Sequence, residues 1–299
     1  MMKRIDNQEI PDVKEVRLVV AGFNAEARIN DFIKHYKNIG VDRIFYIDNN
    51  STDNSIDVLK QHPDVHVWLQ EEKYGDKNKF GVKWMEEILK QYGVGNWCLT
   101  VDVDELFVFP DCENTSIKEF IKEQETKGFD SVKAMFIDMY SNKPLIETKL
   151  EPDKSLIETC NYFDVKYPGI RYRVMEMGCW MQKQPLLYFR ENTVLTPGMH
   201  YIFNSKTPSN IYCCLMHLKF FDDFIDYVNK VKENLNENDI QGYLTIDENT
   251  NFYNSKYSIN YIGTRQLIQL GLMSNAEGTN ELQEKLIKKG AVIDNFFEK

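Results

Sequence analysis

The stretch Leu99-Thr100-Val101-Asp102-Val103-Asp104-Glu105-Leu106 places three carboxylates at the end of an apolar run. Residues 99–101 have the composition of a buried strand, and the chain turns acidic directly after them. In open α/β sheets ligands bind beyond the carboxyl ends of the strands, and carboxylate oxygens suit Mg²⁺ or Mn²⁺. A solvated acidic turn after a strand would show the same pattern, so the interpretation depends on the rest of the chain.

The segment before this stretch alternates apolar strands with amphipathic helices. Helical spacing of apolar residues predicts three helices, the first of them ending near Gly40, which suits a helix C-cap. Four strands separated by three helices predict a parallel sheet with right-handed crossovers. The polar loops after the first, second and fourth strands then share one edge of the sheet. The predicted strands are 16–21, 43–47, 65–69 and 97–101, and the helices carry Ile29, Phe32, Ile33 and Tyr36, then Ile56 and Leu59, then Phe80, Trp84 and Ile88.

The rest of the chain is less regular. A helix is predicted at 116–127, a strand at 132–139, a helix from about 221, and two short tail helices at 264–270 and 280–289. Residues 145–215 have poor periodicity, which is typical of segments that carry function. We expect one α/β domain over 1–230, with a nucleotide-binding half at 15–110 and an acceptor and metal half at 130–220. Residues 231–299 are expected to form a mainly helical C-terminal extension.

Composition excludes several classes of protein. The formal net charge of -10 argues against general binding to nucleic acid, which needs basic surfaces. The longest apolar runs are too short to span a bilayer, so we expect a cytoplasmic protein with at most peripheral contact at the inner face of the membrane. The six cysteines lack Cys-x-x-Cys spacing and are expected to be reduced core residues.

Three motifs carry a resemblance to a known family: Val19-Val20-Ala21-Gly22-Phe23-Asn24, Asp48-Asn49-Asn50-Ser51-Thr52-Asp53 and Asp102-Val103-Asp104-Glu105. In this order they resemble the family-2-type glycosyltransferases with a GT-A fold, the Rossmann-like fold of nucleotide-diphospho-sugar transferases. A narrower resemblance is to a bacterial subfamily of uncharacterised or surface-polysaccharide glycosyltransferases. The chain departs from the wider family at two points. It lacks the proline that usually precedes the loop with Asn24, and it lacks the Glu-Asp pair that marks the catalytic base. The narrower resemblance is carried by 138–141, 162–164, 169–173, 183–186 and 215–221.

The resemblance implies roles for several residues. Asp102 would face the donor ribose or the metal, Asp104 would bind Mn²⁺ or Mg²⁺, and that cation would bridge the donor diphosphate. Asp48 and Asn49 would bond the edge of the nucleobase, with Phe23 and Asn24 closing over it. His217 is expected to be the third metal ligand, and Lys219, on the same face of a strand, to pair with phosphate.

Further basic residues are candidates for the donor site. Arg171 and Arg173 alternate on a segment expected to be extended, and their guanidinium groups suit phosphate. Lys77, in the loop after the third strand, is a further candidate for donor binding. His200 follows Pro197-Gly198-Met199 in a predicted loop, and its role is left open.

The catalytic base is expected to be a carboxylate, because the acceptor hydroxyl loses a proton as it attacks the anomeric carbon. The candidates are Asp138, Asp164 and Glu176. Asp138 is favoured because its strand is expected to neighbour the metal-binding strand. Aromatic residues that could stack on sugar faces are Tyr162, Phe163, Tyr167, Tyr172, Trp180, Tyr188, Phe189 and Tyr201.

The sequence therefore predicts a metal-dependent, inverting glycosyltransferase that moves a sugar from a nucleotide-diphosphate sugar to a hydroxyl of a saccharide or glycolipid acceptor, in bacterial surface-polysaccharide synthesis. One alternative is a sugar nucleotidyltransferase, which would want a Gly-rich loop with Arg or Lys after the first strand. The loop here is Gly22-Phe23-Asn24-Ala25-Glu26, which argues against that class. Another alternative is a catalytically inactive carbohydrate- or nucleotide-binding module on the same fold.

Overall fold

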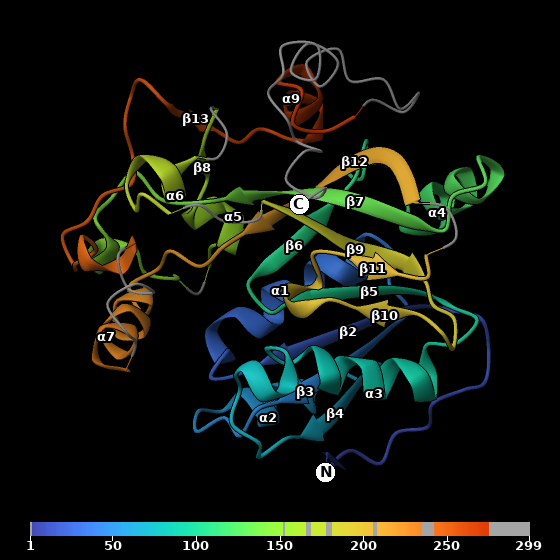
Figure 1. Cartoon of the computed structure of the whole chain (residues 1–299). Helices are drawn as coiled ribbons and strands as arrows, with labels where there is room; N and C mark the ends of the chain where they lie inside the picture. The colour runs from blue at the N-terminus through green and yellow to red at the C-terminus, as the bar shows by residue number, and fades with distance from the viewer. Residues whose placement is uncertain are drawn as a thin grey trace.

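The computed structural model describes residues 2–151, 153–165, 169–177, 181–205, 208–234 and 242–274. Within these residues, nine strands form one sheet in the order β1-β4-β3-β2-β5-β9-β7-β12-β6, and helices cover it (Figure 1). These strands are β1 (Lys3–Arg4), β2 (Val16–Gly22), β3 (Arg43–Asp48), β4 (Val65–Leu69), β5 (Trp97–Asp102), β6 (Glu105–Val108), β7 (Ser131–Asp138), β9 (Gln182–Tyr188) and β12 (Pro208–His217).

Helices and short strands complete the described fold. The longer helices are α1 (Glu26–Asn38), α3 (Val82–Tyr92), α4 (Ile117–Thr126) and α7 (Phe224–Asn234). The shorter ones are α2 (Ser55–Leu59), η1 (Asp76–Asn78), η2 (Leu145–Glu147), α5 (Leu156–Thr159), α6 (Ile170–Arg173), η3 (Pro197–Met199) and α9 (Thr264–Gln269). The remaining strands form two small pairs, β10 (Val194–Leu195) with β11 (Ile202–Phe203), and β8 (Tyr162–Asp164) with β13 (Ser258–Asn260).

The sheet confirms the predicted α/β class. Strands β4, β3, β2 and β5 are parallel neighbours, as the alternation of strands and helices requires. Strands β7 and β12 are parallel to each other and run in the same direction as this group, because β9 is antiparallel to both β5 and β7. The sheet is therefore mostly parallel, and β1, β6 and β9 run against the majority.

Alternate residues of the strands pack on helices on opposite faces. Leu18 and Val20 of β2 belong to one apolar cluster with α1, whereas Val19, between them, belongs to a second cluster with α3. Side chains alternate across a strand, so α1 and α3 cover opposite faces of the sheet. Figure 1 shows α3 lying across the strands of the parallel block. Helix α1 stops at Gly40, whose φ of +100° suits glycine, as the sequence predicts.

The structure overturns three local expectations. Strand β9 lies between β5 and β7, so Asp138 does not sit on the strand next to Asp102, as we had expected. The segment with Arg171 and Arg173 is the short helix α6, which begins after Gly169, and is not extended. Phe80 precedes α3, has a φ of +55° and is 45% exposed, so it does not share the buried face of Trp84 and Ile88.

The edge strand β6 is closed by α1. The Tyr36 hydroxyl donates to the Glu105 carbonyl at 2.9 Å and accepts from the Phe107 amide at 3.0 Å. His35 Nε2 lies 2.8 Å from the Phe107 carbonyl oxygen and donates to it. The outward-facing backbone groups of β6 thus have side-chain partners, which protects this edge from pairing with another strand.

Lowering the pH from 7 to 5 is expected to destabilise the fold through His35. Burial lowers the pKa of His35 to about 4 against an ordinary value of 6.5, although its bond to the Phe107 carbonyl opposes this. The unfolded chain therefore binds a proton at His35 near pH 6.5, whereas the folded chain does so only near pH 4. The stability that neutral His35 contributes to the fold is lost as the pH falls from 6.5 towards 4. At pH 5 the loss is at most about 2 kcal/mol.

Urea unfolding of the wild type and His35→Gln at pH 7 and pH 5 checks this expectation. Glutamine keeps an N–H donor for Phe107 but does not titrate, so the variant should lose less stability between the two pH values. Equal losses in the two proteins would show that His35 does not titrate as described.

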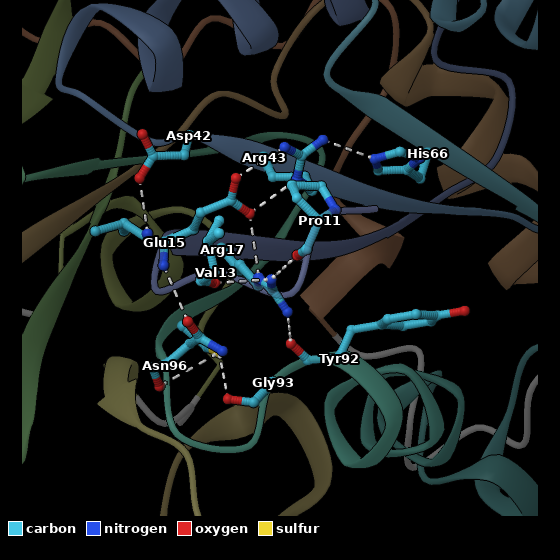
Figure 2. A network of polar contacts seen from close by, with 12 residues as sticks. Pro11, Val13, Glu15, Arg17, Asp42, Arg43, His66, Tyr92, Gly93 and Asn96 are labelled. Carbon is cyan, nitrogen blue, oxygen red and sulfur yellow. Dashed lines mark hydrogen bonds and ion pairs between the residues drawn. The ribbon is translucent and has the colours of Figure 1, made fainter. Parts of the chain in front are cut away.

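A polar network fixes the N-terminal segment across the amino ends of the strands (Figure 2). Arg17 of β2 donates to the carbonyls of Pro11 and Val13 at 3.0 and 3.2 Å. Glu15 bonds Arg43 of β3 at 2.8 Å, and Arg43 in turn reaches the buried His66 of β4 at 3.0 Å. Charged groups at this end of the sheet thus pair with one another.

The C-terminal part of the chain joins the sheet domain through β13, which pairs with β8. Helix α9 covers most of the predicted 264–270 helix, and the predicted 280–289 helix lies outside the described residues. The domain boundary at residue 230 stays a prediction. Across the described part of the chain, no helix combines the length and the apolar composition needed to cross a membrane.

Candidate active site

A cavity of about 640 Å³ lies at the carboxyl ends of the central strands. Residues after β2, β3, β4, β5 and β12 contribute to it, so it sits where ligands bind in open α/β sheets. The predicted loops after the first, second and fourth strands therefore do meet at one edge. The lining residues are Ala21, Gly22, Phe23, Asn49, Asn50, Glu71, Glu72, Lys73, Tyr74, Trp84, Asp102, Val103, Asp104, His217, Lys219 and Tyr227.

A buried lysine contacts the acidic turn that follows β5, Asp102–Glu105. Lys183 of β9 bonds Asp102 Oδ2 at 2.8 Å and also bonds Glu105. The second oxygen of Glu105 accepts the Asp102 amide at 3.1 Å. Burial raises the pKa of Glu105 to about 7, with Lys183 opposing this and the two aspartates reinforcing it. Burial disfavours the charged form of Lys183, but Asp102 and Glu105 outweigh this and raise its pKa.

His217 connects the acidic turn to a second buried carboxylate. Its Nδ1 lies 2.6 Å from Asp138 Oδ1, and its Nε2 lies 3.5 Å from Asp104 Oδ2. Burial would lower the pKa of His217, but Asp104 and Asp138 raise it overall. The Leu218 amide donates to the Asp104 carbonyl at 2.8 Å, which fixes the end of β12 beside the turn. A carboxylate and an imidazole from distant parts of the chain thus face the same point of the cavity.

Two side chains form hydrogen bonds with the carboxylate of Asp138. Arg171 donates to its two oxygens at 2.8 and 3.0 Å, and His217 takes the remaining contact. Burial acts to raise the pKa of Asp138, but Arg171 and His217 bring it well below its usual range. The side chain is 3% exposed. Asp138 is thus placed to orient His217, because a carboxylate at Nδ1 leaves Nε2 directed at Asp104.

The donor set fits one divalent cation between Asp104 and His217. Two ligand atoms 3.5 Å apart can both reach a cation at metal–ligand distances of about 2.0–2.2 Å. The described part of the chain contains no group of three or more His, Cys, Asp or Glu side chains arranged for a metal. Magnesium is usually held by one or two carboxylates together with substrate phosphates and water, so a small set of protein ligands that includes Asp104 is enough for a metal bound with its substrate.

The floor of the cavity is built around Gly22. Gly22 ends β2, and a Cβ atom on it would lie 1.9 Å from the hydroxyl oxygen of Tyr46. Asp48 is buried beside this region, and one of its oxygens accepts the Ser51 amide at 2.9 Å. Among the described residues, its other oxygen and the Tyr46 hydroxyl have no hydrogen-bond partner. Only a residue without a side chain allows β2 to pass this close to Tyr46.

Gly22→Ala is expected to destabilise the protein by about 1–3 kcal/mol, the usual cost of overpacking a core. Tyr46→Phe alone should be neutral or stabilising, because it removes a buried hydroxyl that has no partner in the described structure. The cost of Gly22→Ala should shrink in the Tyr46→Phe background, as measured by urea unfolding. An unchanged cost would place the steric conflict somewhere other than at the hydroxyl.

The other predicted donor-binding residues divide into two groups. Phe23, Asn49 and Lys219 line the cavity. The side-chain Nδ2 of Asn49 donates to the carbonyls of Gln70 and Glu72, and Lys219 Nζ lies 3.9 Å from the centre of the Tyr227 ring. Asn24 bonds Ser51 and Thr52 and holds the loops together without lining the cavity. Lys77 is exposed and also does not line it, whereas Lys73, from the same loop, does.

None of the three predicted base candidates, Asp138, Asp164 and Glu176, lines the cavity. Asp164 bonds Arg173 at 2.8 and 3.0 Å and also bonds Tyr140, so Arg173 is directed at this cluster and not at the donor site. Glu176 is exposed and lines no part of the cavity.

Apart from Phe23, the aromatic lining comes from residues that the sequence did not indicate as ligand-binding. Tyr74, Trp84 and Tyr227 line the cavity, and Tyr74 and Trp84 are in edge contact at 6.2 Å between ring centres. None of the described aromatic candidates between 160 and 203 lines it, and Phe163 and Phe189 are core residues. Tyr167 and Trp180 lie outside the described residues. Lys183 was also missed, because a lysine in the segment Gln182–Tyr188 gives no sign of its distant partners.

His200 has a defined contact close to the acidic turn. Its Nδ1 lies 2.7 Å from the carbonyl of Gln182, the residue before Lys183. Burial lowers the pKa of His200, which favours the neutral imidazole. The contact places His200 on the Lys183 side of the site.

No protein-family model and no curated protein sequence matches the chain. Solved structures similar to part of it include HddC from Yersinia pseudotuberculosis, at 13% identity over 42% of this chain and 60% of that chain, with a TM-score of 0.27. The bifunctional glycosyltransferase WbbM is 12% identical over 44% of this chain and 24% of that chain, with a TM-score of 0.28. The 4-diphosphocytidyl-2C-methyl-D-erythritol synthase is 12% identical over 58% of this chain and 75% of that chain, with a TM-score of 0.31. The matched region thus spans less than two thirds of HddC and of WbbM, and a family assignment does not follow.

Proposed function

We propose that this protein is a metal-dependent glycosyltransferase of the GT-A type that takes a sugar from a nucleotide-diphosphate donor. The observation that carries the proposal is the convergence of Asp104 and His217, 3.5 Å apart, on a cavity at the carboxyl edge of a parallel sheet. The cavity is large enough for a nucleotide, because ligand pockets commonly measure about 300–1,000 Å³. Its aromatic walls and its floor at Gly22 suit a flat nucleobase.

Different residues would bind the metal, the phosphates and the nucleoside of the donor. Asp104 and His217 would hold Mn²⁺ or Mg²⁺, which when bound neutralises the charge that develops on the leaving nucleoside diphosphate. Asp138 would accept a hydrogen bond from Nδ1 of His217 and so direct Nε2 at this position. Lys219 would add a cationic hydrogen-bond donor for phosphate. Phe23 and Asn49 would contact the nucleoside.

The chemistry is an in-line displacement at the anomeric carbon. The oxygen of an acceptor hydroxyl forms the new bond, the bond to the donor phosphate oxygen breaks, and the hydroxyl proton passes to a base. None of the three predicted bases lines the cavity: Asp138 and Asp164 are paired with arginines, and Glu176 is exposed elsewhere. We propose a saccharide or glycolipid acceptor in surface-polysaccharide synthesis at the cytoplasmic side, with at most peripheral membrane contact.

A thermal-shift panel tests this function. Purified protein is melted with each common nucleoside diphosphate, with and without Mn²⁺. One nucleotide should stabilise the fold strongly only when the metal is present, because a ligand that binds the folded state raises the melting temperature. A response that does not depend on metal would contradict the proposed mechanism.

Incubation with the matching nucleotide sugar separates the enzyme from its alternatives. Slow, Mn²⁺-dependent hydrolysis of the donor is expected from a glycosyltransferase without its acceptor. Release of pyrophosphate from a nucleoside triphosphate and a sugar 1-phosphate would instead identify a nucleotidyltransferase. Binding without turnover would identify an inactive module.

A further inference from the structure

Lys183 is placed differently from the other cationic side chains around the cavity. Its side chain is 6% exposed, and it reaches the acidic turn from β9, the antiparallel strand between β5 and β7. Its ammonium group bonds Asp102 at 2.8 Å and also bonds Glu105. Lys219, in contrast, lines the cavity itself. Lys183 is therefore held against the turn by its two carboxylate partners, whereas Lys219 can contact a ligand in the cavity.

The two aspartates of the turn consequently have different partners. Asp102 Oδ2 is bonded by a buried ammonium group, whereas Asp104 Oδ2 faces the imidazole of His217. A divalent cation and an ammonium group compete for the same carboxylate oxygen and repel each other. The partner of Asp104 is an imidazole, which becomes a metal ligand itself when Nε2 gives up its proton, whereas the ammonium group of Lys183 has no lone pair for a cation. Asp102 still lines the cavity, with 39% of its side chain exposed, and can accept hydrogen bonds from a ligand.

Glu105 alone does not explain the position of Lys183. A buried glutamate needs a counter-ion, and Lys183 provides one. Yet the ammonium group also reaches forward to Asp102, at the wall of the cavity. Glu105 in turn accepts the Asp102 amide, so the three residues form a closed ring of contacts. The ring fixes the orientation of Asp102.

We propose that Lys183 is a positioning residue that reserves Asp102 for hydroxyl groups of the donor and keeps it from acting as a metal ligand, so that Asp104 and His217 bind the cation. This inference rests on the proposed function. It predicts that removing Lys183 strengthens metal binding while it weakens catalysis, a combination that loss of structure alone would not produce.

The test compares Lys183→Met/Glu105→Gln with Glu105→Gln. The glutamine removes the charge that would otherwise be buried without a counter-ion, so the pair isolates Lys183 in one background. Binding of Mn²⁺ alone is measured from the loss of the free-ion electron paramagnetic resonance signal. The double variant should bind Mn²⁺ at least tenfold more tightly than Glu105→Gln, with a donor KM at least tenfold higher. Unchanged or weaker Mn²⁺ binding in the double variant would overturn the inference.

A second variant keeps the test sharp if the double variant fails to fold. Asp102→Asn retains Lys183 and should weaken Mn²⁺ binding less than tenfold, against at least 100-fold for Asp104→Asn. Equal losses would overturn the inference, because both aspartates would then be ligands. If the wild type binds neither Mn²⁺ nor any nucleotide, the proposed function falls and this inference falls with it. Mn²⁺ binding by the wild type without the expected difference overturns this inference alone.

Discussion

Asp104→Asn is expected to lower sugar transfer by about 10³-fold and to abolish the Mn²⁺-dependent stabilisation by the nucleotide. Removing one group that stabilises developing charge in an active site costs about 10²–10³-fold in turnover, and here the metal would be lost as well. The carboxylate is the nearest anionic group to His217 Nε2 in the cavity, at 3.5 Å. Asparagine keeps the shape of the side chain but removes the charge that a divalent cation requires.

Initial rates with the matching donor and melting temperatures with and without Mn²⁺ measure this loss. Asp64→Asn is a suitable control, because Asp64 pairs with Lys37 at 2.9 Å and does not line the cavity. The control should keep the metal-dependent shift. An Asp104→Asn protein that retained both activity and the metal-dependent shift would exclude Asp104 as a metal ligand.

Asp138→Asn is expected to weaken Mn²⁺ binding and turnover by about 10–100-fold, although Asp138 does not line the cavity. Partners that orient a metal-binding histidine typically have effects of this size. Asparagine can present its amide to Nδ1, which would place the imidazole proton on Nε2 and direct it at Asp104. Arg171 would also lose its bidentate partner.

Asp164→Asn provides a closely matched control for this change. Asp164 and Asp138 are each 3% exposed, and each accepts two bonds from one arginine at 2.8 and 3.0 Å. Both variants should lower the melting temperature, because each leaves a buried arginine contact incomplete. Only Asp138→Asn should weaken Mn²⁺ binding, measured by the same resonance titration. Comparable losses of Mn²⁺ binding in the two variants would mean that Asp138 acts on stability alone.

Local regularity made the first hundred residues predictable. Strands of the parallel block are buried on both faces and are therefore continuous apolar runs, and their helices repeat apolar residues at helical spacing. Loops that follow parallel strands must lie at one edge of the sheet. The meeting of Gly22, Asn49 and Asp102 at one cavity follows from that topology.

The antiparallel strands were not predictable in the same way. Gln182–Tyr188 includes Lys183 and Pro185, which local propensity does not assign to a buried strand. In the sheet β9 is nevertheless buried, and the ammonium group is stabilised by carboxylates more than seventy residues earlier in the chain. Its insertion also separates β5 from β7, which is why the expected neighbourhood of Asp138 was wrong.

The sequence by itself determined the parallel sheet, the edge at which its polar loops meet and the acidic turn at Asp102–Glu105, because period, strand length and loop polarity are local properties. Only the tertiary structure decided how charges are paired. It gives Asp102 to Lys183, Asp104 to His217 and Asp138 to Arg171. Such pairs join residues far apart in the chain, and the charge of a carboxylate says nothing about which distant cation the fold will bring to it. The physical reason is that burial strongly disfavours a charge without a partner, while the register of the strands determines which partner lies beside it.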